Sequence, residues 1–170
     1  MGIQDLFDNS SVRRQDRLLE IGRATEILED SEYGFLALGG GDAYGIPLNY
    51  VYREGSLYFH CAPGGEKLER VGEGCSACFC IVGHTLPLPA RFTTEYESII
   101  AFGHISQVVN DEERMEALML IVAKYSAEFM DTGRKYAGKS FGRTAILRLD
   151  IERISGKTKQ VDKVPDSPVE

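Results

Sequence analysis

The 170-residue sequence lacks several features that would each define a class of protein. It has no basic excess, because 26 Asp and Glu residues outnumber 19 Lys and Arg residues and the formal net charge is −7. That balance argues against general nucleic-acid binding, which needs a basic surface. The sequence also has no apolar run of the ~20 residues that a membrane span requires, and its first residues lack the basic-then-apolar layout of a secretory signal. We therefore expect a cytoplasmic protein with no nucleic-acid or membrane partner.

Cysteine is scarce, and its spacing only partly fits a metal site. The four cysteines are Cys61, Cys75, Cys78 and Cys80. The spacing of the last three, with His84 nearby, is compatible with zinc. However, there is no second cysteine pair at finger spacing, and residues 76–82 read as a strand that would place Cys78 and Cys80 on one face and Cys75 on the other. Small thiols are common in protein cores, so we favour packed thiols and expect no metal.

The stretch from Leu57 to Val71 predicts a strand, a sharp turn and a short helix. Aromatic residues favour the strand, whereas Pro63 followed by two glycines permits a tight turn. A glycine turn before a helix leaves backbone N–H groups free to face an anion, and His60 and Lys67 flank it with potential cationic donors. The stretch therefore indicates a phosphate-binding site. The alternative is an ordinary strand-to-helix turn with a solvated lysine.

The other strand-like segments surround this stretch. Apolar or alternating patterns predict strands over 33–38, 43–52, 76–82, 92–109 and 144–154. Short turns predict that 33–38, 43–52 and 56–60 form an antiparallel meander, and residues 83–89 read as an irregular loop with two prolines. Pro47 cannot donate to a ladder, so it indicates an edge, a bulge or an opening of the sheet. Gly103 indicates a bend or bulge in its long strand.

Helical spacing is clear in two places. We expect one helix over 21–30 and another that has Asn110 or Asp111 as its N-cap and continues to Tyr125. Residues 126–142 read as a connection that contains glycine and lysine and has room for one short helix. Six antiparallel strands with a few helices predict a mainly β fold, a six-stranded antiparallel split β-barrel with accessory helices. We place an N-terminal arm at 1–20, one domain at 21–157 and a C-terminal tail at 158–170.

Four segments occur in an order that points to a known family. They read EYGFLAL at 32–38, YGIPLNY at 44–50, LYFHCA-x-x-G-x-K at 57–67 and T-x-Y-x-SI-x-x-FG at 94–103. Together they resemble the FMN-binding split-barrel proteins of the pyridoxamine 5′-phosphate oxidase-like superfamily, and within it the nitroimidazole-resistance branch. The resemblance implies an FMN cofactor and a homodimer with the flavin site at its interface.

The resemblance also implies positions for the cofactor. The strand that holds Pro47, Leu48, Asn49 and Tyr50 would run beside the flavin ring, and Phe59, His60, Cys61 and Ala62 would pass the ring edge and ribityl chain. Lys67 would bind the phosphate, and Ser98 would supply a polar contact. His60 is also the candidate catalytic residue, because it is the side chain there that can change charge near neutral pH. A purely structural hydrogen bond is the alternative role for His60.

The resemblance implies a function with alternatives. The sequence has no Trp and no Arg-Leu-x-Pro-like segment near its end, so oxidation of vitamin B6 is not expected. The first expectation is an FMN-dependent oxidoreductase, in the manner of a nitroreductase, that takes electrons from NADH or NADPH. The alternatives are a non-catalytic flavin- or haem-binding carrier or sensor, a deazaflavin-binding reductase, and a barrel with an empty pocket.

Overall fold

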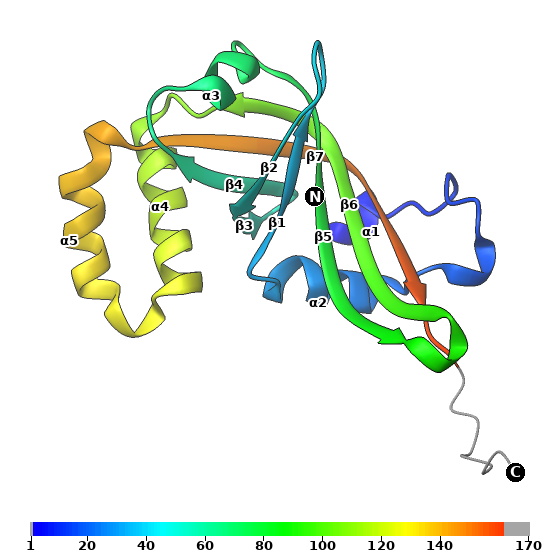
Figure 1. The fold of residues 1–170 in the computed structure, drawn as a ribbon. Coiled ribbons are helices and arrows are strands. Elements are labelled where there is room, and N and C mark those ends of the chain that lie inside the picture. Colours follow the sequence, from blue (N-terminus) through cyan, green and yellow to red (C-terminus); the bar gives the residue numbers. More distant parts are fainter. Residues whose placement is uncertain (1, 162–170) are drawn as a thin grey trace, which may run out of the picture.

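The computed structural model describes residues 2–161, which form a curled antiparallel sheet with helices at its ends (Figure 1). The strands are β1 (Tyr33–Leu38), β2 (Tyr44–Asn49), β3 (Val51–Arg53), β4 (Ser56–Cys61), β5 (Cys75–Leu88), β6 (Thr93–Gln107) and β7 (Ala145–Lys159). The helices are α1 (Ile3–Leu6), α2 (Ile21–Asp30), α3 (Glu66–Val71), α4 (Asp111–Tyr125) and α5 (Met130–Ser140). Four 3₁₀ turns are η1 (Gln15–Arg17), η2 (Pro89–Arg91), η3 (Ala127–Phe129) and η4 (Phe141–Arg143).

The predicted split barrel is confirmed, with one more strand than expected. The order of the seven strands is β2-β1-β5-β6-β7-β4-β3, and every pairing is antiparallel. The sheet curls so that its two ends approach each other, and β2 comes close to β4 without pairing with it. We call this line between β2 and β4 the seam. Pro47 therefore lies on an edge strand, where its missing N–H costs no ladder bond.

The extra strand arises because the expected strand over 43–52 is broken at Tyr50. The first part, β2, pairs with β1, and the second part, β3, pairs with β4 at the opposite end of the sheet. The predicted three-stranded meander is therefore wrong. Tyr50 is fully buried, and its backbone N–H and C=O bond to the hydroxyl of Tyr125 instead of a neighbouring strand.

The core lies inside the curl and follows the period-two alternation of the strands. In β1, Gly34, Leu36 and Leu38 are buried while the residues between them are exposed. The rings of Tyr50 and Phe59 each meet Phe79 edge-on, with centroids 5.0 Å apart. Burial of such side chains contributes roughly 1.5–3 kcal/mol each and is the main force that closes the sheet.

A second, smaller cluster attaches the α4–α5 hairpin to the outer side of β4 and β7. It consists of Val108, Ala117, Leu118, Ala137 and Ile146. The predicted cap of α4 is confirmed, because the Asn110 side chain accepts a hydrogen bond from the Glu113 N–H at 2.9 Å. The expected connection over 126–142 is mostly the helix α5. Figure 1 shows the hairpin beside one end of the sheet and the N-terminal segment beside the other.

The long strands β5 and β6 test two further predictions, the bulge at Gly103 and the irregular loop over 83–89. Gly103 does mark a bulge, because the β6–β7 register shifts between Phe102 and Gly103, and a Cβ at Gly103 would lie 1.9 Å from the Asp150 carbonyl oxygen. The prediction of an irregular loop over 83–89 is wrong. β5 continues through it to Leu88 with only a register shift between Val82 and Thr85, and Pro87 lies opposite Thr94.

The N-terminal arm packs on its own chain. Phe7 bridges Ile154, Leu18 bridges Lys157, and Leu6 and Leu19 are buried in the core. The last strand, β7, continues to Lys159, two residues into the expected C-terminal tail at 158–170, and residues 162–170 of that tail lie outside the described residues. In the part of the chain that the structure describes, no helix is both long and apolar enough to cross a membrane.

Candidate cofactor site

The predicted strand, turn and helix are present where the sequence placed them. β4 ends at Cys61, the chain turns at Gly65 with a φ of 99°, and α3 begins at Glu66. Only glycine adopts that φ without strain, so the turn depends on Gly65. Lys67 lies in the first turn of α3 and is half-buried, and within residues 2–161 it has no hydrogen-bond or ion-pair partner. An unpaired cation next to a glycine turn suits an anionic group.

The charge of Lys67 reaches the end of β4. Burial lowers the pKa of His60 below its usual value near 6.5, and the Lys67 ammonium lowers it further, so the imidazole is neutral at pH 7. Burial raises the pKa of the Cys61 thiol, partly offset by Lys67, so the thiol remains protonated. Along β4, Phe59 points into the core and His60 points to the outer side. Ala62, the next residue after Cys61, is exposed.

Across the seam, β2 offers a free backbone edge. It pairs with β1 on one side only, so the N–H and C=O groups on its other side are free of ladder bonds. Leu48 packs partly against the core, whereas Pro47 and Asn49 are exposed. The Asn49 side chain donates to the Glu32 carbonyl oxygen at 2.9 Å, which holds the end of β2 against the start of β1.

Two contacts hold the seam at its ends. At one end, the Arg70 guanidinium of α3 donates to the Asp42 carbonyl oxygen at 2.9 Å and lies 5.0 Å from the centre of the Tyr44 ring. At the other end, the Tyr125 hydroxyl of α4 accepts a bond from the Tyr50 N–H at 2.9 Å and lies 2.7 Å from the Tyr50 carbonyl oxygen. The strand that carries Pro47, Leu48, Asn49 and Tyr50 is therefore fixed at both ends.

Most of the predicted site residues thus flank the seam within one chain. They are Pro47, Leu48, Asn49 and Tyr50 from β2 and the break after it, Phe59, His60, Cys61 and Ala62 from the end of β4, and Lys67 from α3. Ser98 is not among them. On β7, His60 lies opposite Ile146, whereas the β6 residue Ser98 lies opposite Lys157. At about 3.3 Å per residue, these two positions on β7 are roughly 35 Å apart.

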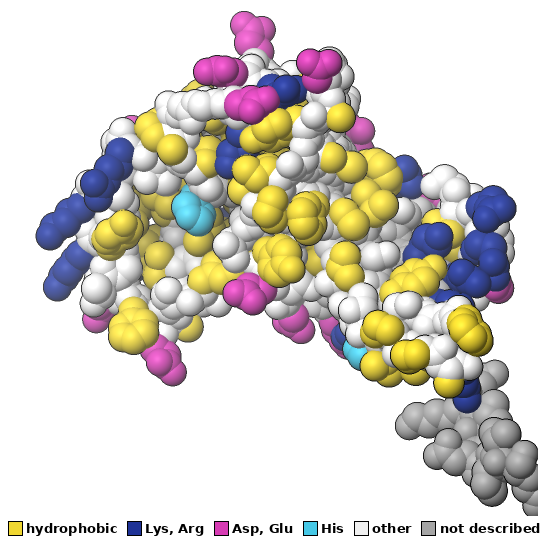
Figure 2. Space-filling view, viewed as in Figure 1, with side chains coloured by type: hydrophobic (Ala, Val, Ile, Leu, Met, Phe, Trp, Pro, Cys, Tyr) yellow, Lys and Arg dark blue, Asp and Glu magenta, His cyan; other side chains and the backbone are white. Residues whose placement is uncertain are grey.

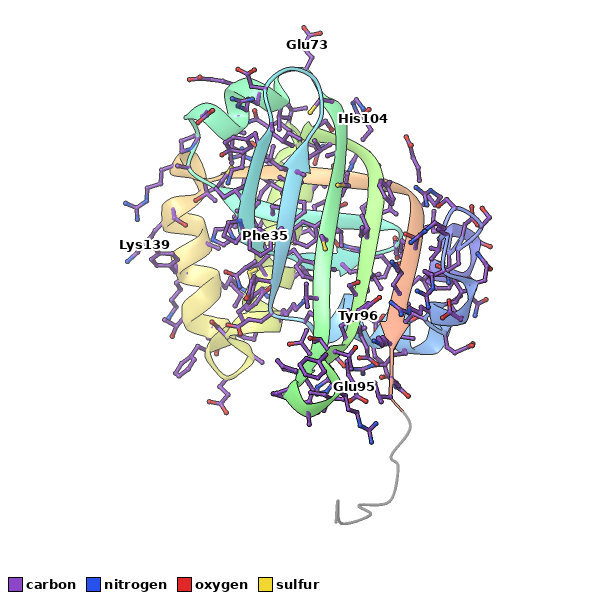
Figure 3. The ribbon with its side chains drawn as sticks, turned by 45° about the vertical axis from the view of Figure 1, so that its right-hand side comes forward. Phe35, Glu73, Glu95, Tyr96, His104 and Lys139 are labelled. Carbon is purple, nitrogen blue, oxygen red and sulfur yellow. The ribbon has the colours of Figure 1, made fainter. Side chains whose placement is uncertain are left out.

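Ser98 lies instead on an apolar outer face of the sheet. Tyr33, Phe35 and Val82 on this face are 54%, 50% and 52% exposed, and Val82 lies directly opposite Ser98. Figure 2 shows hydrophobic side chains gathered over this face, and Figure 3 shows Phe35 at its front. The Cys78 and Cys80 thiols are half-buried and free, and Cys80 lies opposite Phe35. Among the described residues, no group of three His, Cys, Asp or Glu side chains could hold a metal ion.

Sequence reasoning missed a cavity that adjoins the site on the side of the α4–α5 hairpin. His60, Cys61 and Ala62 also line a cavity of about 460 Å³ whose other residues come from α4, α5 and the segment after α5, Arg143 among them. The signal for α5 was weak, because the helix contains two glycines and few large apolar residues. No local pattern joins Arg143 to His60, since tertiary packing alone brings them together.

The fold and the site define a split-barrel protein, and the comparisons give its family. Residues 21–158 match the family profile described as pyridoxamine 5′-phosphate oxidase. The match spans most of the chain, so the chain belongs to this family, as its four sequence segments predicted. A search of curated protein sequences found no match.

Solved structures with the same fold are distant in sequence. One is a provisionally assigned 5-nitroimidazole antibiotic resistance protein from Bacteroides thetaiotaomicron, 19% identical over 84% of this chain and 86% of that one, with a TM-score of 0.66. The flavocytochrome Anf3 from Azotobacter vinelandii is 17% identical over 91% and 75%, with a TM-score of 0.74. A FAD- and haem-binding protein from Mycobacterium smegmatis is 18% identical over 88% and 77%, with a TM-score of 0.74. At these identities the likeness establishes the fold alone.

Proposed function

We propose that this protein binds FMN in the seam and acts as a flavin-dependent oxidoreductase of the cytoplasm. The observation that carries the proposal is Lys67 beside the glycine turn, which has no hydrogen-bond or ion-pair partner among the described residues, in a chain that belongs to the pyridoxamine 5′-phosphate oxidase family. Two of the neighbouring structures are a flavocytochrome and a FAD- and haem-binding protein, which supports a flavin in this fold. The nitroimidazole-resistance neighbour favours a nitroreductase, with NADH or NADPH as the electron donor.

The residues at the seam fit the parts of FMN. Lys67 and the backbone N–H groups near Gly65 would hold the phosphate, which is a dianion. The free edge of β2, from Pro47 to Tyr50, would offer backbone groups to the polar edge of the ring, and the end of β4 would line its other side. When bound, FMN supplies hydride and electron transfer. His60 is neutral near pH 7 and can take up or release a proton beside the ring.

We further propose that two copies form a dimer through the outer sheet face. Tyr33, Phe35 and Val82 make this face apolar, and exposed apolar patches of this kind mark interaction sites. A second copy on this face would bring its own Ser98 toward the seam of the first. That arrangement gives Ser98 a route to the flavin that a single chain does not offer. An apparent mass of two chains in sedimentation at micromolar concentration tests the dimer, and a single-chain mass contradicts it.

The catalytic part is tested by anaerobic reduction. The FMN-loaded protein is mixed with NADH or NADPH, and the flavin absorbance is followed before and after addition of a nitroaromatic compound. Bleaching by a nicotinamide and recovery with the nitro compound support the oxidoreductase. Bound flavin that neither nicotinamide reduces contradicts it and favours the second candidate, a non-catalytic flavin carrier or sensor. A haem absorption band would favour the haem-binding form of that candidate, which the two haem-containing neighbours suggest.

A further inference from the structure

A cavity lies between the end of β4 and the α4–α5 hairpin, and it shares His60, Cys61 and Ala62 with the candidate cofactor site. Its volume is about 460 Å³, within the range of pockets that hold small molecules. Its floor is apolar, with Leu118, Ile121 and Ala137 all less than 10% exposed. Four α5 residues line the cavity: Gly133, Ala137 and Ser140 are small, whereas Tyr136 adds an aromatic ring. A ligand here would therefore bury an apolar body against the two helices.

The polar groups at the cavity are cationic or neutral. The Arg143 guanidinium is exposed, and it has no hydrogen-bond or ion-pair partner among residues 2–161. The Ser140 and Thr144 hydroxyls are already used, because they donate to the carbonyl oxygens of Ala137 and Ser140 respectively. No acidic side chain of the described chain lines the cavity. Within the described part of the chain, Arg143 is thus an unpaired cation at the mouth of an apolar pocket.

The surroundings strengthen the preference for an anion. α5 carries Arg134, Lys135 and Lys139 on exposed positions, and Lys67 lies close enough to His60 to lower its pKa. Figure 2 shows Lys and Arg side chains along the outer edge of α5. Guanidinium groups bind carboxylates with two parallel hydrogen bonds, whereas an apolar floor rejects a ligand that is charged throughout. The arrangement selects a molecule with an apolar body and one carboxylate.

We propose that this cavity is a binding site for a small aromatic carboxylate, with the carboxylate on Arg143 and the ring on the floor formed by Leu118, Ile121 and Ala137. The cavity meets the candidate cofactor site at His60, Cys61 and Ala62, so the two ligands would lie side by side. The proposal does not depend on flavin chemistry, because every group it uses belongs to this chain.

The test uses 2-naphthoate and its neutral counterpart 2-naphthamide, with binding followed by the fluorescence of the naphthalene ring and by calorimetry. The sequence contains no tryptophan, so indole emission does not interfere. We expect saturable one-to-one binding of 2-naphthoate and at least tenfold weaker binding of 2-naphthamide. Arg143→Met should weaken 2-naphthoate about 10- to 100-fold and remove the difference between the two probes, as loss of a charge-assisted bond implies. Equal binding of both probes to the unaltered protein would overturn the proposal.

Two controls make the result specific. Arg134→Met removes the same charge from the exposed side of α5 and should leave 2-naphthoate affinity within twofold. Ala137→Leu fills the floor and should weaken both probes together, with circular dichroism showing that the fold is intact. FMN affinity of Arg143→Met should equal that of the unaltered protein. Loss of FMN binding in this variant, together with competition between FMN and 2-naphthoate, would show that the cavity belongs to the cofactor site and would refute the separate carboxylate site without affecting the proposed function.

Discussion

Replacing Tyr125 with Phe removes a single oxygen atom that joins α4 to the break between β2 and β3. This oxygen accepts the Tyr50 N–H at 2.9 Å and lies 2.7 Å from the carbonyl oxygens of both Tyr50 and Glu32. The hydroxyl carries one proton and can donate to one of these carbonyls at a time. Because the break in the strand leaves the Tyr50 backbone without ladder partners, the variant leaves its N–H and C=O groups unpaired.

The expected cost follows from these bonds. An unpaired buried backbone donor costs about 1–3 kcal/mol, and the lost donated bond adds about 0.5–1.5 kcal/mol. The Glu32 carbonyl is exposed and regains water, so it adds little. We expect Tyr125→Phe to lower the free energy of unfolding by about 2 kcal/mol, which for a domain of this size lowers the Tm by roughly 4–8 °C.

Urea unfolding followed by circular dichroism measures this change. Tyr136→Phe is the matched control, because the Tyr136 side chain is 66% exposed and its loss of a hydroxyl should leave stability unchanged. The same preparations should show weaker FMN binding for Tyr125→Phe, since the end of β2 is no longer held. A loss of less than about 0.5 kcal/mol, or an equal loss in the two variants, would refute the idea that this hydroxyl replaces the missing ladder bonds.

Further predictions concern the turn, the histidine and the bulge. Lys67→Ala should weaken FMN binding by about 1.5–3 kcal/mol, measured by flavin fluorescence titration, and an unchanged dissociation constant would remove Lys67 from the site. Because burial and Lys67 lower the pKa of folded His60, the unfolded state binds the proton more readily, so stability should fall as the pH drops through about 6.5, and His60→Asn should reduce that loss. In the histidine NMR titration, Lys67→Met should raise the His60 pKa, and an unmoved pKa would argue against their proximity. Gly103→Ala should cost more than about 2 kcal/mol in urea unfolding because its Cβ meets the Asp150 carbonyl, whereas Gly138→Ala, with open space around it, should not destabilise the protein.

Features that depend on neighbours in the chain were predictable from the sequence. The turn at Gly65 and the bulge at Gly103 follow from the backbone freedom of glycine, and the start of α4 follows from the capping side chain of Asn110. An edge was one of the three positions that Pro47 indicated, because proline cannot donate to a central ladder, and the structure places it there. Four of the predicted strands also follow directly from alternation or from β-branched and aromatic residues.

Features set by distant contacts were not predictable in this way. The break at Tyr50 depends on Tyr125, which lies 75 residues away, so the segment over 43–52 reads as one continuous strand. Pro87 suggested a loop, because proline usually interrupts a strand. Local rules cannot show that β5 continues there, paired with β6, so that Pro87 lies opposite Thr94. Similarly, the cavity beside His60 depends on how the α4–α5 hairpin docks, and α5 has too few large apolar residues to reveal its buried side.

The most direct test of the account is a titration of the flavin-free protein with FMN, followed by quenching of flavin fluorescence, beside Lys67→Ala and Lys139→Ala. Lys139 lies on the outer side of α5, away from the seam, so its variant removes the same charge without touching the site (Figure 3). The account predicts binding at micromolar concentration or tighter for the unaltered protein and Lys139→Ala, and roughly 10- to 150-fold weaker binding for Lys67→Ala. Failure of the unaltered protein to bind FMN at micromolar concentration, or equal binding by all three, would contradict it.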